Sequence, residues 1–255
     1  MRLLSALFLF FLTATTAASA ENVVLGLSQD QVSISTDFDG SEILIFGAIK
    51  REEPIPEGAP LEVIITLAGP LQPLTVRRKE RRLGIWVNTD AVQIDAAPSF
   101  YAVATSGPWD EVITNVEDLR HHISIPRAIR SVGAPMQVQD SQAFSAAVIR
   151  IREKEGTYQL RESAVEISES TLFNTSIAMP ANLVEGSYPM RIFLTRGGQV
   201  ISSFETVIAV RKVGLERWLY QLSRQQPLIY GLMSIAIAIA AGWGASTAFR
   251  LLRSG

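Results

Sequence analysis

Hydrophobic and polar positions follow five successive patterns along the chain. Residues 21–107 contain short alternating runs separated by Pro and Gly, which predicts an N-terminal β-sandwich domain. Residues 108–156 change to apolar spacings of three and four, which predicts a helical insert, and 157–213 return to short strands. The pattern in 214–226 favours an amphipathic interfacial helix, and 227–249 carry no charged side chain.

These patterns predict a mainly β fold: an immunoglobulin-like β-sandwich with a two-helix insert, followed by an amphipathic helix and one C-terminal transmembrane helix. We expect the insert to contain one helix over Trp109–His121 and a second from Asp140 or Ser141 to about Glu155. In the membrane-proximal β region, Gly186-Ser187-Tyr188 precedes a strand, as in the tyrosine corner of immunoglobulin-like sandwiches. The pattern leaves open whether the two β regions form one domain or two.

Residues 227–249 are predicted to cross a membrane. As a helix they would be about 34 Å long, against a hydrocarbon core of about 30 Å. Small side chains recur every four residues within this segment, which allows close contact with another membrane helix, although a segment rich in Ala and Gly also produces such a stripe by chance. The candidate contact stripe is Ser234, Ala238, Gly242 and Ser246.

The N-terminus has the pattern of a secretory signal peptide over residues 1–20. Arg2 precedes an apolar run of about ten residues, and Ala18-Ser19-Ala20 fits a cleavage site. Export would make this a single-pass membrane protein with the bulk of the chain outside the cytoplasm. Residues 250–255 would then be a cytoplasmic tail.

The composition argues against several kinds of chemistry. The chain has no cysteine, which excludes disulfides and thiolate ligands, and a net charge of −2 gives no reason to expect nucleic acid. We predict neither a cofactor nor a metal, because the adjacent His121 and His122 would point about 100° apart on a helix. The G-x-S-x-G, S-x-x-K and G-x-G-x-x-G motifs are absent, and we do not expect an enzyme.

The densest charge cluster, residues 77–82, contains five basic residues and Glu80. Alternation along a strand would place cations on both faces, so neither face can be ordinary core, which predicts a projecting or edge hairpin. The basic residues can protect a sheet edge from pairing, or they can bind lipid head groups, an acidic partner or an anionic ligand beside an aromatic rim. The candidate interaction surface is Arg77, Arg78, Lys79, Arg81, Arg82, Trp86, Asn88, Phe100 and Tyr101.

The segment from Thr75 to Asn88, together with Pro98–Val103, resembles a family of uncharacterised alphaproteobacterial transmembrane proteins. The likeness extends to Gly186-Ser187-Tyr188 and to Val210–Gly214, and so covers nearly the whole mature chain. The resemblance implies a single-span inner-membrane protein with a periplasmic domain and no assigned activity. It also implies, as a loose association, a neighbouring exporter of the sulfite or organosulfonate type.

We therefore expect a membrane-anchored periplasmic accessory or binding module, whose partners are the lipid bilayer and an inner-membrane protein or envelope component. The alternative is an extracytoplasmic enzyme with an unrecognised site near His121, His122 and the basic hairpin. The partner, the ligand and the oligomeric state do not follow from the sequence.

Overall fold

Each of the two sheets contains strands from both predicted β regions, so the two regions share one core. The computed structural model of the chain describes residues 22–34, 38–51, 58–130, 141–212 and 215–253. The expected signal peptide at 1–20 and the last two residues of the expected tail lie outside this part.

The first sheet has four strands in the order β1-β3-β10-β9, and every neighbouring pair is antiparallel. Its strands are β1 (Asn22–Leu27), β3 (Gly40–Lys50), β10 (Leu172–Pro180) and β9 (Glu166–Ser168).

The second sheet has six strands in the order β2-β12-β11-β4-β7-β8. Its edge pairs, β2 with β12 and β7 with β8, are parallel, and the pairs between them are antiparallel. The strands are β2 (Gln31–Ile34), β12 (Gln199–Lys212), β11 (Gly186–Arg196), β4 (Leu61–Ala68), β7 (Tyr101–Thr105) and β8 (Tyr158–Arg161).

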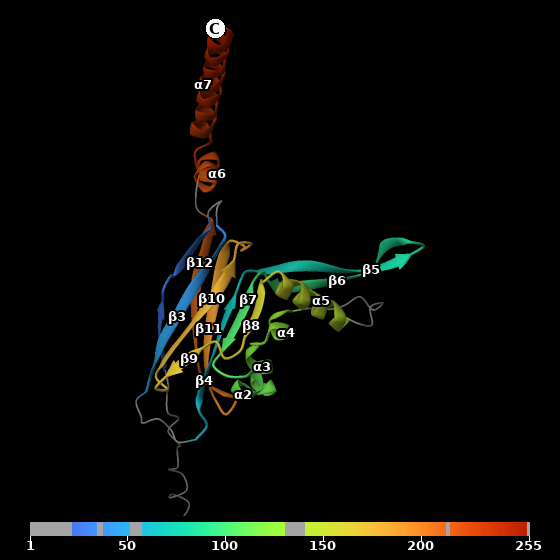
Figure 1. Ribbon diagram of the computed structural model, residues 1–255, viewed down its shortest axis with the longest axis vertical. Coiled ribbons are helices and arrows are strands. Elements are labelled where there is room, and N and C mark those ends of the chain that lie inside the picture. Colours follow the sequence, from blue (N-terminus) through green and yellow to red (C-terminus); the bar gives the residue numbers. More distant parts are fainter. Residues whose placement is uncertain (1–21, 35–37, 52–57, 131–140, 213–214, 254–255) are drawn as a thin grey trace, which may run out of the picture.

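The two sheets pack face to face around the main hydrophobic core (Figure 1). Ile43 and Ile45 of β3 and Phe173 of β10 meet Ile65 of β4 and Ile192 of β11, and all five are almost completely buried. The inward side chains recur every second residue along these strands, which is why the alternating pattern was visible in the sequence. The mainly β fold is confirmed.

Short helices cover part of the outer face of the six-stranded sheet (Figure 1). Val112, Ile123 and Ile125 from the helical region pack with Ile64 of β4 and Phe193 of β11. The helices are α2 (Trp109–Val112), α3 (Asn115–His121), α4 (Ile125–Ala128) and α5 (Ser141–Lys154).

The expected single helix over 109–121 is wrong, because it is broken between α2 and α3. Ile113 has an extended backbone, and the Thr114 amide donates to the Gly198 carbonyl at 2.9 Å. The Thr114 hydroxyl then accepts from the Glu117 amide and caps α3. The break leaves Val116 exposed. The apolar residues of this segment therefore do not form a single buried face, although their spacing suggested one. The second helix is confirmed, with Gly156 in the left-handed region just after it.

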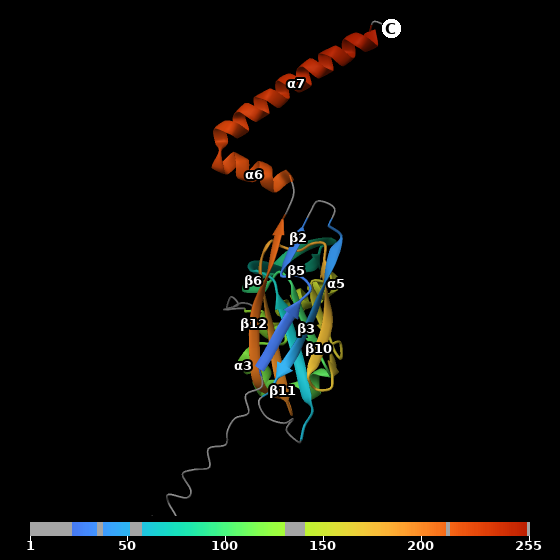
Figure 2. The same cartoon turned by 90° about the vertical axis from the view of Figure 1, so that its left-hand side faces the viewer.

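Two further features extend away from the sandwich (Figures 1 and 2). One is a separate two-stranded hairpin of β5 (Leu71–Arg82) and β6 (Ile85–Pro98). The other is formed by α6 (Leu215–Gln225) and α7 (Pro227–Arg253), which follow the end of β12. Pro227 is the first residue of α7 and separates it from α6, since proline fits the first turn of a helix and breaks a preceding one.

The expected tyrosine-corner contact is present locally. The Tyr188 hydroxyl donates to the Val184 carbonyl at 2.7 Å, four residues before it, and the ring is buried against Phe100. This contact fixes the entry of β11 into the sheet. The strand order does not confirm the immunoglobulin-like subtype of the sandwich.

Candidate functional site

The basic residues predicted as an interaction surface lie on the β5–β6 hairpin, which we call the arm. Arg82 pairs with Ile85, so the turn consists of Leu83 and Gly84, whose φ angles are +50° and +87°. Two successive positive φ angles are typical of a type I′ turn, whose twist matches the right-handed twist of a hairpin. At about 3.3 Å per residue, β5 is about 40 Å long, so the arm reaches well beyond the sandwich.

The root of the arm is held by α5. Ile94 and Ala97 of β6 are buried against Val148 of α5, with Leu74 and Val76 of β5 beside them. This small core explains why the first half of the hairpin is ordered beside the sandwich. It also defines the face of the arm that rests on α5.

Further along the same face, the Arg78 guanidinium lies 4.7 Å from the centre of the Phe144 ring of α5, a cation–π contact. Beyond this point the side chains lose their cover, because every residue from Lys79 to Trp86 is exposed. The outer half of the arm, residues 79–88, is therefore available to another molecule.

The two faces of the arm differ in charge. On the α5 side, Arg78 lies 4.0 Å from Asp90, and Arg82 forms an ion pair with Glu80 at 3.3 Å. The other face carries Arg77, Lys79 and Arg81, since side chains alternate along β5. Their partners across the hairpin are Ala91, Asn88 and Trp86, none of which is acidic. Of the nine predicted surface residues, five share this face, which we call the basic face.

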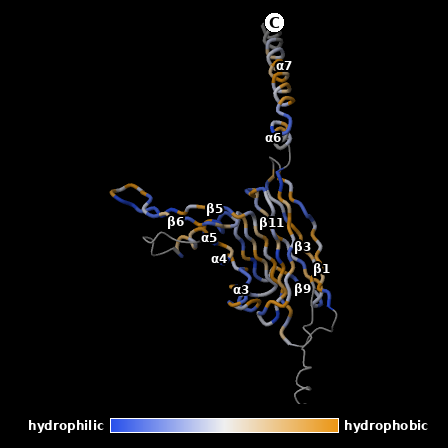
Figure 3. Tube along the Cα trace, turned by 180° about the vertical axis from the view of Figure 1, so that it is seen from behind, coloured by the Kyte–Doolittle hydropathy of each residue, from blue (hydrophilic) through white to orange (hydrophobic). Residues whose placement is uncertain are grey.

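The tip of the arm is apolar. Leu83 is fully exposed, Ile85 is 65% exposed and Trp86 is 68% exposed. Figure 3 shows this as a hydrophobic end on a hairpin that is otherwise largely hydrophilic. The sequence reasoning included Trp86 and missed Leu83 and Ile85. A signal existed in the turn itself, where Leu stands at a position that usually holds Asn, Asp or Gly.

Phe100 and Tyr101 do not join this surface, which corrects the expected aromatic rim. Both are at most 2% exposed, because β7 lies inside the six-stranded sheet with both faces covered. The Tyr101 hydroxyl donates to the Ile123 carbonyl at 2.8 Å and accepts from Arg191 at 3.3 Å. Burial raises the pKa of Tyr101, although the Arg191 charge acts in the opposite direction.

The arm leaves the sandwich beside the strand that leads to α6. Pro70, which precedes β5, lies against Gly186, where an added Cβ would be 2.5 Å from the proline ring. Gly186 pairs with Val210 of β12, two residues before that strand ends at Lys212. The root of the arm and the start of the α6–α7 segment are therefore at the same end of the sandwich (Figure 1).

The two histidines lie apart from the basic face of the arm. His121 is within 3.4 Å of the buried Glu117 carboxylate, which also accepts from Arg120 at 2.6 Å. His122 ends α3 in the left-handed region and lines an open cavity of about 610 Å³ with Arg191. That cavity includes Leu71 and Pro98 from the root of the arm but none of its five basic residues. In the described part of the chain, no three His, Asp or Glu side chains gather as a metal site.

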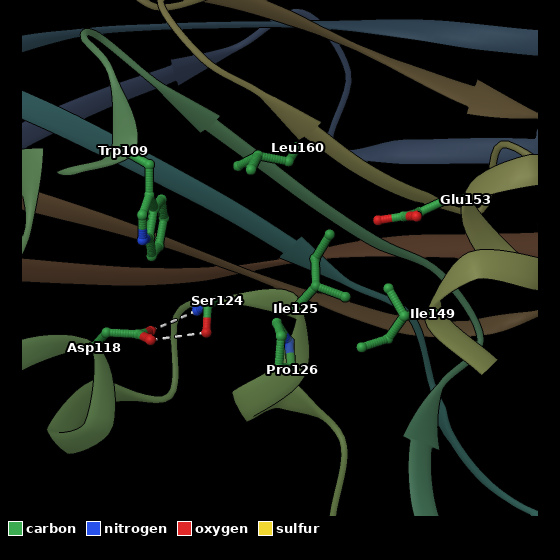
Figure 4. Close-up of a pocket in the computed structure, with 8 residues that line it drawn as sticks. All are labelled: Trp109, Asp118, Ser124, Ile125, Pro126, Ile149, Glu153 and Leu160. Carbon is green, nitrogen blue, oxygen red and sulfur yellow. Dashed lines mark hydrogen bonds between the residues drawn. The ribbon is translucent and has the colours of Figure 1, made fainter. Parts of the chain in front are cut away.

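A second pocket, of about 340 Å³, lies between the helices and β8 (Figure 4). Trp109, Ile125 and Leu160 give it a mainly apolar lining. Its buried carboxylate, Asp118, is already engaged: it accepts from the Ser124 amide at 2.7 Å and from the Ser124 hydroxyl at 2.8 Å. These bonds close the connection between α3 and α4, so Asp118 has a structural role.

The outer face of the four-stranded sheet is also apolar and exposed. Val24, Ala48 and Leu172 lie in one row across β1, β3 and β10, and Phe46 lies in the next row over Gly26. A groove of about 470 Å³ follows these residues. Val24, Leu44, Phe46 and Leu172 are each about half exposed. We call these four residues the bare face; the sequence reasoning did not single them out.

Residues 22–251 match the family model described as "Putative transmembrane protein (Alph_Pro_TM)". The chain belongs to this family. The match confirms the resemblance noted in the sequence, and its extent includes the sandwich, the arm, α6 and most of α7. No curated protein matches the chain.

In this Alph_Pro_TM protein, α7 is the candidate membrane span. Its apolar part, Pro227–Ser246, is long enough to cross a bilayer, and none of it is buried within the protein. The small-residue stripe lies along this exposed helix, where an added Cβ at Gly242 would meet nothing within 4 Å. A contact through Ser234, Ala238, Gly242 and Ser246 therefore stays a prediction. The family and the span together indicate a single-pass membrane protein.

Proposed function

We propose that this protein is a membrane-anchored periplasmic accessory module that binds another inner-membrane protein through the bare face, without catalysing a reaction itself. The exposed apolar row across β1, β3 and β10 carries the proposal. Contiguous apolar surface on a folded domain is costly in water and marks sites of association.

The two sheets differ in how the chain covers them. Helices α2 to α4 cover part of the outer face of the six-stranded sheet, and the four-stranded sheet presents Phe46 and Leu172 to the outside. The uncharged Gly26, Ala48 and Asn174 lie between these side chains, and the charged Glu42 and Lys50 lie on the same face at either end of the row. An uncharged apolar patch matches the core of a protein–protein interface better than it matches charged lipid head groups.

The span indicates which proteins are within reach. Because α7 anchors the chain, the sandwich moves in the plane of one membrane, and the effective concentration of other proteins there is high. A partner anchored in the same membrane can therefore be bound by a modest apolar contact. An exporter of the sulfite or organosulfonate type, suggested by the family resemblance, is the first candidate to test.

Site-specific photocrosslinking in native membranes tests the proposal. A photoreactive amino acid in place of Phe46 or Leu172 should give adducts with a specific membrane protein. Leu160 lies on β8, at an edge of the six-stranded sheet, and is exposed to a similar degree. The same photoreactive group in place of Leu160 should give no adducts. Adducts with a second copy of the chain alone, or equal labelling from all three positions, would contradict the proposed partner.

A substitution then separates binding from folding. Phe46→Gln and Leu172→Gln change half-exposed side chains, so the free energy of unfolding should change by less than about 1 kcal/mol. Co-purification of the crosslinked partner should nevertheless be lost. If the double variant retains the partner, the bare face is not the binding surface.

A further inference from the structure

The outer half of the arm carries a second exposed apolar group, built differently from the bare face. Leu83, Ile85 and Trp86 project from a hairpin and have no packing on the sandwich. Leu83 also adopts a positive φ, a conformation that costs a non-glycine residue of order 1 kcal/mol or more. An apolar side chain at the turn, where Asn or Gly would be more stable, needs an explanation outside the folding of the hairpin.

On one face of the arm, the charges beside this tip all have the same sign. The basic face carries Arg77, Lys79 and Arg81 opposite uncharged residues, while the acidic residues Glu80 and Asp90 lie on the other face. Cations followed by Trp and aliphatic side chains are the combination found at membrane interfaces. The cations bind phosphate groups, and the apolar residues enter the boundary between head groups and acyl chains.

The root of the arm lies at the end of the sandwich that faces the membrane-anchoring helices. This is the end from which β12 leads to α6, as the contact of Pro70 with Gly186 shows. At the root, the basic face points away from α5, because the opposite face rests on Val148. In Figure 1, α5 and α6 lie on opposite sides of the arm. The basic face therefore leaves the sandwich on the side of the membrane-anchoring helices.

We propose that the outer half of the arm is a second membrane contact, specific for anionic phospholipids. Arg77, Lys79 and Arg81 bind their phosphate groups, and Leu83, Ile85 and Trp86 enter the interface of the leaflet on the sandwich side. Protection of a sheet edge explains the cations but leaves the apolar tip unexplained, since exposed apolar residues on a hairpin favour association. The proposal depends on the α7 anchor and is independent of the partner proposed for the bare face.

The absence of cysteine permits a direct test with the full-length protein in vesicles. An Asn88→Cys variant places a single thiol on the basic face, next to the tip, for an environment-sensitive fluorophore. Vesicles contain phosphatidylcholine alone or phosphatidylcholine with phosphatidylglycerol. The fluorophore should shift to the blue, and be quenched by lipid-attached quenchers, in vesicles with phosphatidylglycerol. High salt should reverse both effects.

Two matched charge reversals decide whether the cations cause the effect. Lys79→Glu with Arg81→Glu should lower the bound-to-free ratio of the arm by at least about 25-fold, about fivefold for each lost cation. Arg150→Glu with Lys154→Glu makes the same change in net charge on exposed positions of α5 and should leave the ratio within about twofold. Equal effects of the two pairs would overturn the assignment to the basic face.

A tip variant tests the apolar part without a risk to folding. Leu83→Asn suits the left-handed turn better than leucine does, so the hairpin should be retained while quenching by acyl-chain quenchers falls. A fluorophore that stays in water in both lipids would overturn the proposal. A blue shift of the fluorophore that appears only in native membranes, and in neither kind of vesicle, would mean that the arm binds a protein and would also overturn the proposal. Photocrosslinking from position 46 should persist in the variant with Lys79→Glu and Arg81→Glu. The lipid contact of the arm can therefore fail its test while the partner of the bare face passes its own.

Discussion

At the scale of single residues, the turn between β11 and β12 shows how two adjacent glycines can differ in importance. Gly197 and Gly198 have φ angles of +55° and +76°, so alanine at either position would occupy the left-handed region. A Cβ at Gly197 would lie 3.8 Å from Ala59, an ordinary contact, whereas a Cβ at Gly198 would lie 2.9 Å from the Thr114 side chain. Thr114 is held there because its backbone amide donates a hydrogen bond to the Gly198 carbonyl.

We therefore expect Gly197→Ala to lower the free energy of unfolding by about 1 kcal/mol and Gly198→Ala by about 2–4 kcal/mol. Urea unfolding of the detergent-solubilised protein, followed by circular dichroism, measures both. Equal effects would mean that the Thr114 contact adds nothing to the conformational cost of the turn.

Buried tyrosines make stability depend on pH in the alkaline range. Burial raises the pKa of Tyr158 to about 12, and its hydroxyl donates to the Pro98 carbonyl at 2.8 Å. The folded protein thus prefers the protonated phenol. This contribution is complete below about pH 10, the pKa of the unfolded chain, and is lost as the pH rises toward about 12. Tyr158→Phe should be less stable at pH 8 but should lose less stability between pH 8 and pH 11. Urea unfolding at pH 8 and pH 11 measures both proteins. An equal loss of unfolding free energy between the two pH values in the wild type and in Tyr158→Phe would contradict this.

At the scale of elements, the arm depends on a small core that it shares with α5. Val148 is 5% exposed and packs against Ile94 and Ala97 of β6. Val148→Ala should destabilise this contact by about 1–2 kcal/mol, and it should do so locally because the main core lies elsewhere. Hydrogen exchange should become faster in β5 and β6, with β3 and β11 unchanged. Ala146 is exposed on the same helix, so Ala146→Ser serves as the control. If Val148→Ala accelerated hydrogen exchange equally in all strands, the arm would not be a separate unfolding unit.

The elements that could be predicted are those whose signals are local. Three features follow from nearby residues: the alternation along β3 and β10, the end of α5 before Gly156, and the long uncharged part of α7. The break between α2 and α3 could not be predicted, because it depends on a bond from Thr114 to Gly198, far along the chain. Burial of Phe100 and Tyr101 depends on the position of β7 between β4 and β8, and short apolar runs do not distinguish that position from an exposed one.

The candidate site was predictable to a similar extent. The run of cations at 77–82 predicted a projecting hairpin, and alternation alone placed Arg77, Lys79 and Arg81 on one face. The root beside β12 could not be foreseen, because it arises from the packing of Pro70 on Gly186. The bare face could not be foreseen either, because its row combines β1 and β3 with β10, which lies far along the chain.

At the scale of the whole molecule, the proposed orientation requires the arm and the C-terminus to lie on opposite sides of one membrane. Since α7 is the candidate span, the sandwich and residues after 253 are separated by its apolar length. The chain has no cysteine, so an introduced thiol can be labelled without background. Gln93→Cys lies on β6 at an exposed position, and Ser254→Cys lies after α7.

In intact cells whose outer membrane has been made permeable, a membrane-impermeant maleimide should label Gln93→Cys fully. It should label Ser254→Cys only after the inner membrane is disrupted by detergent, because the charged reagent cannot cross the hydrocarbon core. Labelling in the reverse order would place the sandwich in the cytoplasm. In that case the arm would face the cytoplasmic leaflet, whose surface is also anionic, and the basic face could still bind it. The labelling experiment therefore tests the orientation, and the vesicle experiment tests the lipid contact.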